Sequence, residues 1–69
     1  MTKELFFEVN KEIFYLKIEK KEIIIPKGFT YYTVTVIGSK GVVLQKNFSI
    51  ETSVSDILAE CKTECELAA

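Results

Sequence analysis

The side chains with the most chemical potential in this sequence are two thiols, Cys61 and Cys65, which lie four residues apart near the C-terminal end. On a helix this spacing places both thiols on one face, where they could supply half of a zinc site that a second copy would complete. A disulfide within one helical turn has unfavourable geometry. We interpret both as small buried hydrophobic residues, and we expect no metal site and no cofactor.

The rest of the chain lacks the usual parts of an active site. It contains no histidine and no arginine, so it has neither an ordinary general base near neutral pH nor a bidentate clamp for phosphate. The Glu residues are scattered over turns and strand exteriors, which is typical of solvated charges. The segment Gly38-Ser39-Lys40-Gly41 lacks the spacing of a phosphate-binding loop and joins two strands. We therefore expect no catalytic residue and no enzymatic activity.

Composition indicates one small globular domain spanning residues 1–69. Apolar residues make up 48% and charged residues 28%, and the net charge of -1 supplies no field that would attract nucleic acid or an acidic membrane. No apolar run reaches the length of a signal peptide or a membrane span, so we expect a cytoplasmic protein. A chain this short buries a modest share of its surface, which favours self-association.

Two alternating segments at the N-terminal end predict a hairpin. Residues 4–9 and 12–19 alternate between apolar and polar positions, and a two-residue loop at Asn10-Lys11 sets Phe7 opposite Phe14. The same register pairs Leu5 with Leu16, Phe6 with Tyr15, and Glu4 with Lys17. The residue pairing on both faces thus supports one register.

The next segment is harder to interpret. A tight turn at Lys20-Lys21 would align Ile18 with Ile23 and Leu16 with Ile25, giving a short strand that ends at Pro26. Residues 29–37 and 42–50 form a clearer pair. A three-residue loop, Ser39-Lys40-Gly41, sets Val36 opposite Leu44 and Tyr32 opposite Phe48, with Gly41 in a left-handed conformation.

The chain ends in an amphipathic helix that begins near Thr52-Ser53, with Ser53 as its N-cap. Its apolar stripe contains Val54, Ile57, Leu58, Cys61 and Cys65. The predicted fold class is α+β: a four- to five-stranded antiparallel sheet, a meander of hairpins, with one C-terminal helix packed on one face.

One helix covers one face of a sheet, so the second face is the candidate functional surface. Its predicted members are Phe6, Ile13, Tyr15, Ile24, Tyr31, Thr33, Thr35 and Val43. An uncovered apolar face of this kind usually marks an interface. The alternative is that strong twist closes the sheet into a small barrel and buries part of both faces.

Two functions could use this second face. The favoured one is a protein-binding module, a homodimer or a regulator that occludes a partner protein, as an inhibitor from a phage or mobile element does. The alternative is a domain for single-stranded nucleic acid, with stacked aromatics and Lys17, Lys20, Lys21, Lys27 and Lys46 on the phosphates. The residues expected to bind a partner are Phe6, Ile13, Tyr15, Lys17, Tyr31, Thr33 and Thr35.

At the level of topology alone, hairpins followed by a covering helix resemble small coactivator domains that bind single-stranded DNA. The same order resembles compact phage-encoded inhibitors such as certain anti-CRISPR proteins. No sequence motif carries either resemblance, so neither implies a role for any single residue of this chain.

Overall fold

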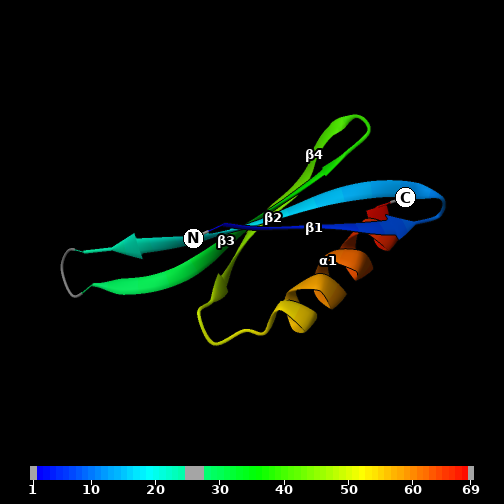
Figure 1. Cartoon of the computed structure of the whole chain (residues 1–69). Helices are drawn as coiled ribbons and strands as arrows, with labels where there is room; N and C mark the ends of the chain where they lie inside the picture. The colour runs from blue at the N-terminus through cyan, green and yellow to red at the C-terminus, as the bar shows by residue number, and fades with distance from the viewer. Residues whose placement is uncertain (1, 25–27, 69) are drawn as a thin grey trace.

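Four antiparallel strands and one helix make up the fold in the computed structural model, which describes residues 2–24 and 28–68 (Figure 1). The elements are β1 (Thr2–Val9), β2 (Glu12–Ile23), β3 (Phe29–Gly38), β4 (Gly41–Ser49) and α1 (Val54–Ala68). The strands pair in chain order and the sheet is open, which confirms the predicted meander and rules out a closed barrel. Within the described residues, no helix is long and apolar enough to cross a membrane.

The first hairpin has the predicted register. Asn10 and Lys11 form its turn with φ angles of 50° and 69°, the pair of positive values that a two-residue hairpin loop with matching twist requires. Phe7 lies opposite Phe14 and Leu5 opposite Leu16. The rings of Phe7 and Phe14 stack with centroids 5.4 Å apart.

The predicted turn at Lys20-Lys21 is wrong. β2 continues through these lysines to Ile23 and pairs with β3, so that Leu16 faces Val36 and Ile18 faces Val34. The Gly28 N–H donates to the Ile24 carbonyl at 3.1 Å, and Gly28 has a φ of 57°. The predictions for Ile25 and Pro26 fall outside the described residues.

Because β2 is so long, one end of the second hairpin extends past its neighbours. Among the described residues, β1 begins opposite Glu19 and β4 ends opposite Tyr31, so Lys20–Ile23 have no strand on their β1 side and Phe29–Thr30 have none on their β4 side. We call these two segments the arm. Figure 1 shows it projecting away from the helix, and the molecule measures 43 × 21 × 19 Å along its principal axes.

The last hairpin has the predicted pairs but a different turn. Val36 lies opposite Leu44 and Tyr32 opposite Phe48, as expected, and Gly41 has a positive φ of 115°. The turn itself contains only Ser39 and Lys40, since Gly38 pairs with Gly41. Val43 is the extra residue and forms a bulge next to the Val36–Leu44 pair, so β4 has the expected faces from Leu44 onwards while Ile37 pairs with Val42.

The helix covers one face of the sheet, which we call the covered face. The Ser53 hydroxyl accepts a hydrogen bond from the Asp56 N–H at 3.1 Å, which confirms the predicted N-cap. The predicted stripe faces inward: Ile57, Cys61 and Cys65 are buried in the core, and Val54 and Leu58 pack against it. The sheet contributes the other buried residues: Phe7, Val9, Phe14, Leu16, Ile18, Val34 and Val36.

Candidate interaction surface

The second face of the sheet has no element packed over it among the described residues, and we call it the open face (Figure 1). Strand residues alternate between faces, so the register assigns every other position to it. Its composition changes along the strands: an apolar patch lies at each end and a polar belt lies between them. The sequence predicted members of this face, but it did not predict their distribution along the strands.

The first apolar patch lies near the turns that join β1 to β2 and β3 to β4. One row of paired residues runs across all four strands through Phe6, Tyr15, Ile37 and Val42, and Ile13 lies beside it. Phe6 and Ile13 are 70% and 58% exposed. The rings of Phe6 and Tyr15 are tilted against each other with centroids 5.4 Å apart. We call these five residues the turn-end patch.

The middle of the open face is polar. Two rows of paired residues form this polar belt: Lys17, Thr35 and Gln45 in one row, and Glu19, Thr33 and Asn47 in the next. Gln45 Nε2 donates to Thr35 Oγ1 at 3.1 Å, and Thr33 Oγ1 donates to Asn47 Oδ1 at 3.0 Å. These cross-strand bonds fix the orientation of the polar side chains.

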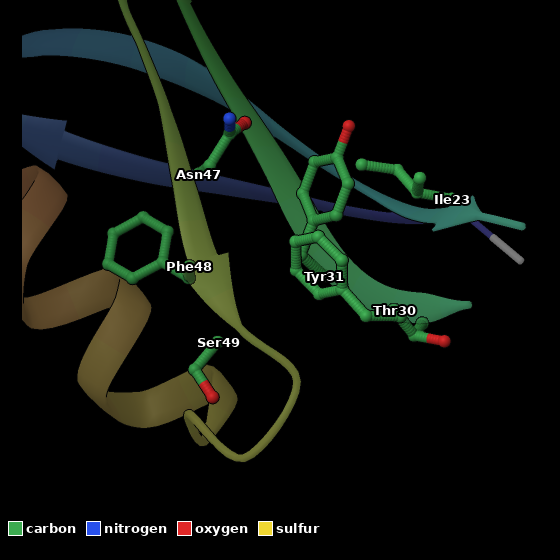
Figure 2. A pocket seen from close by; sticks show the side chains of 7 residues that line it. Ile23, Thr30, Tyr31, Asn47, Phe48 and Ser49 are labelled. Atoms are coloured by element: carbon green, nitrogen blue, oxygen red, sulfur yellow. The ribbon is translucent and has the colours of Figure 1, made fainter. Parts of the chain in front are cut away.

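The second apolar patch contains Ile23 and Phe29 of the arm together with Tyr31, the next open-face residue of β3; we call it the arm-end patch. The rings of Phe29 and Tyr31 lie 5.5 Å apart, and Phe29 is 60% exposed. Figure 2 shows Ile23 beside Tyr31, with Asn47, Phe48 and Ser49 of β4 across from them. Together these residues line a hollow of about 460 Å³.

The charged side chains of β2 on the open face alternate in sign and form ion pairs with each other. Glu19 lies 3.6 Å from the Lys21 ammonium and 4.0 Å from that of Lys17. At the β1 edge, the Tyr15 hydroxyl donates to Glu4 Oε2 at 2.8 Å, and this hydrogen bond to a carboxylate raises the pKa of Tyr15. The open face therefore contains both acidic and basic groups.

The structure places all seven predicted partner-binding residues on the open face, but it divides them. Phe6, Ile13 and Tyr15 lie in the turn-end patch, Lys17, Thr33 and Thr35 in the polar belt, and Tyr31 in the arm-end patch. Among the other predicted members, Ile24 is 77% exposed beyond the end of β2. The prediction for Val43 is wrong, because the bulge places it beside Phe14 and Cys65 of the covered face. The sequence assigned Ile23 to the helix side, whereas the longer β2 places it on the open face.

The lysines proposed for nucleic acid do not form one basic groove. Lys46 lies on the covered face, where its ammonium approaches Glu60 at 2.9 Å and Glu64 at 3.4 Å. The hydrogen bond to Glu60 raises the pKa of Lys46. Lys17 and Lys21 flank Glu19, and Lys27 lies outside the described residues. This arrangement gives little support to phosphate binding along a strand.

The two thiols are packed in the core beneath the helix. Cys61 is fully buried and Cys65 nearly so. Burial raises the pKa of Cys61 to about 11 and also raises that of Cys65, because a thiolate is poorly solvated in apolar surroundings. Both groups are therefore protonated and weakly nucleophilic near neutral pH. In the described ranges, no cluster of three or more His, Cys, Asp or Glu side chains has the arrangement of a metal site.

Two polar contacts were missed by the sequence analysis. Glu12 accepts hydrogen bonds from the Ser39 N–H at 3.2 Å and the Ser39 hydroxyl at 2.9 Å, which joins the two turns and lowers the pKa of Glu12. No local pattern signals a contact between turns so distant in sequence. The position of Lys46 was predictable, however, because it alternates in phase with Leu44 and Phe48 on the covered face.

The chain matches no protein-family model, and no curated protein or solved structure is significantly similar to it. Its function must therefore be inferred from its own surface.

Proposed function

We propose that this chain is a non-enzymatic protein-binding module that acts by burying its open face against a protein, in the first instance a second copy of itself. The observation that carries the proposal is the exposure of large apolar side chains on this face. Those at least 38% exposed are Phe6, Ile13, Ile23, Phe29 and Val42. An uncovered set of this size in a small chain favours an interface.

The free energy gained by burying apolar surface also favours self-association. A chain of 69 residues has a small core, and burial of apolar surface contributes roughly 25 cal/mol per Å². The ordered polar belt supplies hydrogen-bonding groups of the kind that interfaces use to set orientation. Such a module would act as a dimer or by occluding part of its partner. The lack of histidine and the protonated thiols support a role without catalysis.

Light scattering coupled to size-exclusion chromatography, run over a range of concentrations, tests self-association directly. We expect a mass that rises from 7.9 kDa towards twice that value. Ile13→Ser should weaken the dimer about tenfold, because Ile13 is a strongly exposed apolar side chain, and truncating an apolar anchor of an interface costs more than about 1 kcal/mol. Leu67→Ser is the matched control, since Leu67 is an 81% exposed aliphatic residue on the helix.

A mass that stays at 7.9 kDa up to about 1 mM chain would overturn self-association, because binding weaker than this contributes little under ordinary conditions. Titration with a labelled single-stranded oligonucleotide provides the contrast. Tight, salt-sensitive binding that Tyr15→Ala abolishes would instead support the nucleic-acid alternative.

A further inference from the structure

The open face of β2 has a self-complementary order of side chains. From one end of the strand to the other it presents Ile13, Tyr15, Lys17, Glu19, Lys21 and Ile23. The order is apolar, aromatic, basic, acidic, basic, apolar. When a second copy of this strand runs in the opposite direction, Ile13 of each copy faces Ile23 of the other, and Lys17 of each copy faces Glu19 of the other. A surface with this property can pair with an inverted copy of itself.

We propose that two copies pack their open faces together across a two-fold axis that crosses β2 between Lys17 and Glu19 and runs from strand to strand. This inference rests on the proposed self-association and specifies its geometry. The two β2 strands lie antiparallel over each other, within the range of about 30° at which twisted sheets pack face to face. β2 suits this role because it is the longest strand and is flanked by β1 and β3.

Charge determines which two-fold axis is favourable. Across the proposed axis, Lys17 lies over Glu19 of the partner subunit, and the contact occurs twice in the dimer. An axis running along β2 would instead stack Lys17 on its own copy and Glu19 on its own copy. Like charges juxtaposed in an interface cost several kcal/mol, so the crossing axis is favoured. The ion pairs set the register, while the apolar ends supply the affinity.

The shapes of the two ends support the same axis. It brings Ile13 and Ile37 of the turn-end patch of one copy over the arm-end patch of the other, at both ends of the dimer. Ile13, a protruding aliphatic side chain, then approaches the hollow lined by Ile23, Phe29 and Tyr31 of the partner subunit (Figure 2). Ile37 likewise comes over the partner's Tyr31. Each hollow thus receives apolar side chains from the opposite copy.

Edge-to-edge pairing through β4 is disfavoured by the strand itself. β4 contains a bulge next to Val36, and its Lys46 side chain is turned to the covered face, where Glu60 and Glu64 hold it. Bulges and inward-pointing charges are devices that keep an edge strand from pairing with another chain. Face-to-face packing through β2 meets neither obstacle.

A pair of charge reversals tests the axis. Lys17→Glu sets two carboxylates against each other at both contacts, and Glu19→Lys sets two ammonium groups together. We expect each variant alone to have a dimer Kd at least about 100-fold higher than the original chain. Mixed in equal amounts, the two variants should form a heterodimer, because both contacts are then a carboxylate against an ammonium group. Light scattering and native mass spectrometry of the full chain measure the masses.

The experiment with mixed variants distinguishes an effect on contacts between two chains from an effect on contacts within one chain. Each variant keeps its like charges within its own chain, so a heterodimer cannot be explained by repair of the internal Lys17–Glu19 pair. Lys40→Glu and Glu51→Lys are matched controls that change net charge equally at exposed positions outside the polar belt. These controls should dimerise like the original chain.

The outcomes distinguish this inference from the proposed function. If the original chain dimerises and the charge variants also dimerise unchanged, the proposed axis is wrong and self-association stands, with pairing at the β1 edge as the next candidate. If the original chain stays monomeric, the self-association itself is wrong. Should a reversal unfold the chain by circular dichroism, Lys17→Gln and Glu19→Gln replace it. We expect about tenfold weaker dimers from these neutral variants, and unchanged dimers would overturn the axis.

Discussion

The covered and open faces are built from alternate residues of the same strands, yet they have opposite designs. The covered face is apolar where the helix packs on it, with Leu16, Val34 and Val36 fully buried, and its charged side chains, such as Lys46, lie at the margins of the helix. The open face is apolar only at its ends, and its centre is a belt of fixed polar groups. A face that must hold a fold together needs continuous apolar packing, whereas a face that must recognise a partner also needs polar groups to set the register.

Truncation on the two faces should show this contrast most strongly. Leu16→Ala removes a fully buried side chain from the covered face and should lower the free energy of unfolding by about 2–5 kcal/mol. Ile13→Ala, on the open face of the same strand, should cost less than about 1 kcal/mol, since Ile13 is 58% exposed. Urea denaturation at concentrations where the chain is monomeric measures both. Equal losses would mean that the open face is also a core.

The turn between β3 and β4 keeps the two faces distinct, because a shift of one residue moves every β4 side chain to the other face. Gly41→Val should lower the free energy of unfolding by about 1–3 kcal/mol, since Gly41 has a φ of 115° that a β-branched residue rarely adopts. Gly41→Asn is the control and should cost less, because Asn tolerates positive φ better. An unchanged melting temperature for the Val variant would count against the assigned turn.

The buried thiols make the stability of the covered face depend on pH. Burial raises the pKa of Cys61 to about 11, so the folded chain holds its proton at pH values where the unfolded chain releases it. This part of the stability is complete below the ordinary thiol pKa and is lost as the pH rises towards 11. We expect the urea midpoint to fall over this range, and to fall less in Cys61→Ala. Identical pH profiles would show that the thiol is not the cause.

The smallest expected effect concerns the charge on the covered face. Lys46→Met keeps the side-chain length but removes the ion pairs with Glu60 and Glu64, which lie at the exposed margin of the helix. Exposed pairs contribute little, so the melting temperature should fall by only a few degrees and the difference should shrink at high salt. Lys62→Met is the control, because it removes a lysine charge from the helix that carries Glu60 and Glu64 and leaves Lys46 in place. A large, salt-insensitive loss would show that Lys46 has a packing role.

The parts of the fold that the sequence predicted correctly have strong local signals. Asn10-Lys11 and Gly41 specify their turns, and alternating apolar residues then set the register of each hairpin. The prediction failed at Lys20-Lys21 for a physical reason. The arm extends beyond β1, so both of its faces contact solvent and the alternation fades although the strand continues. Charged residues there were therefore interpreted as a turn.

The sequence predicted part of the membership of the candidate surface, but it missed Ile23, Phe29, Ile37 and Val42 and did not predict the arrangement. Alternation alone placed Phe6, Tyr15 and Tyr31 on one face. The separation into patches and a belt depends on which residues stand side by side across three pairs of strands. Because a turn was predicted at Lys20-Lys21, Ile23 was assigned to the wrong face and the arm-end patch was not predicted. The symmetric order of side chains on β2 depends on the full length of the strand.

The order of elements has a consequence for how the chain folds during synthesis. Every strand pairs with its neighbours in sequence, so each hairpin can close over a short loop as soon as it leaves the ribosome. The helix comes after the whole sheet, and it packs against β1, the first strand made. Until that late contact forms, the nascent sheet exposes both of its faces. The final step of folding therefore also determines which face remains available to a partner.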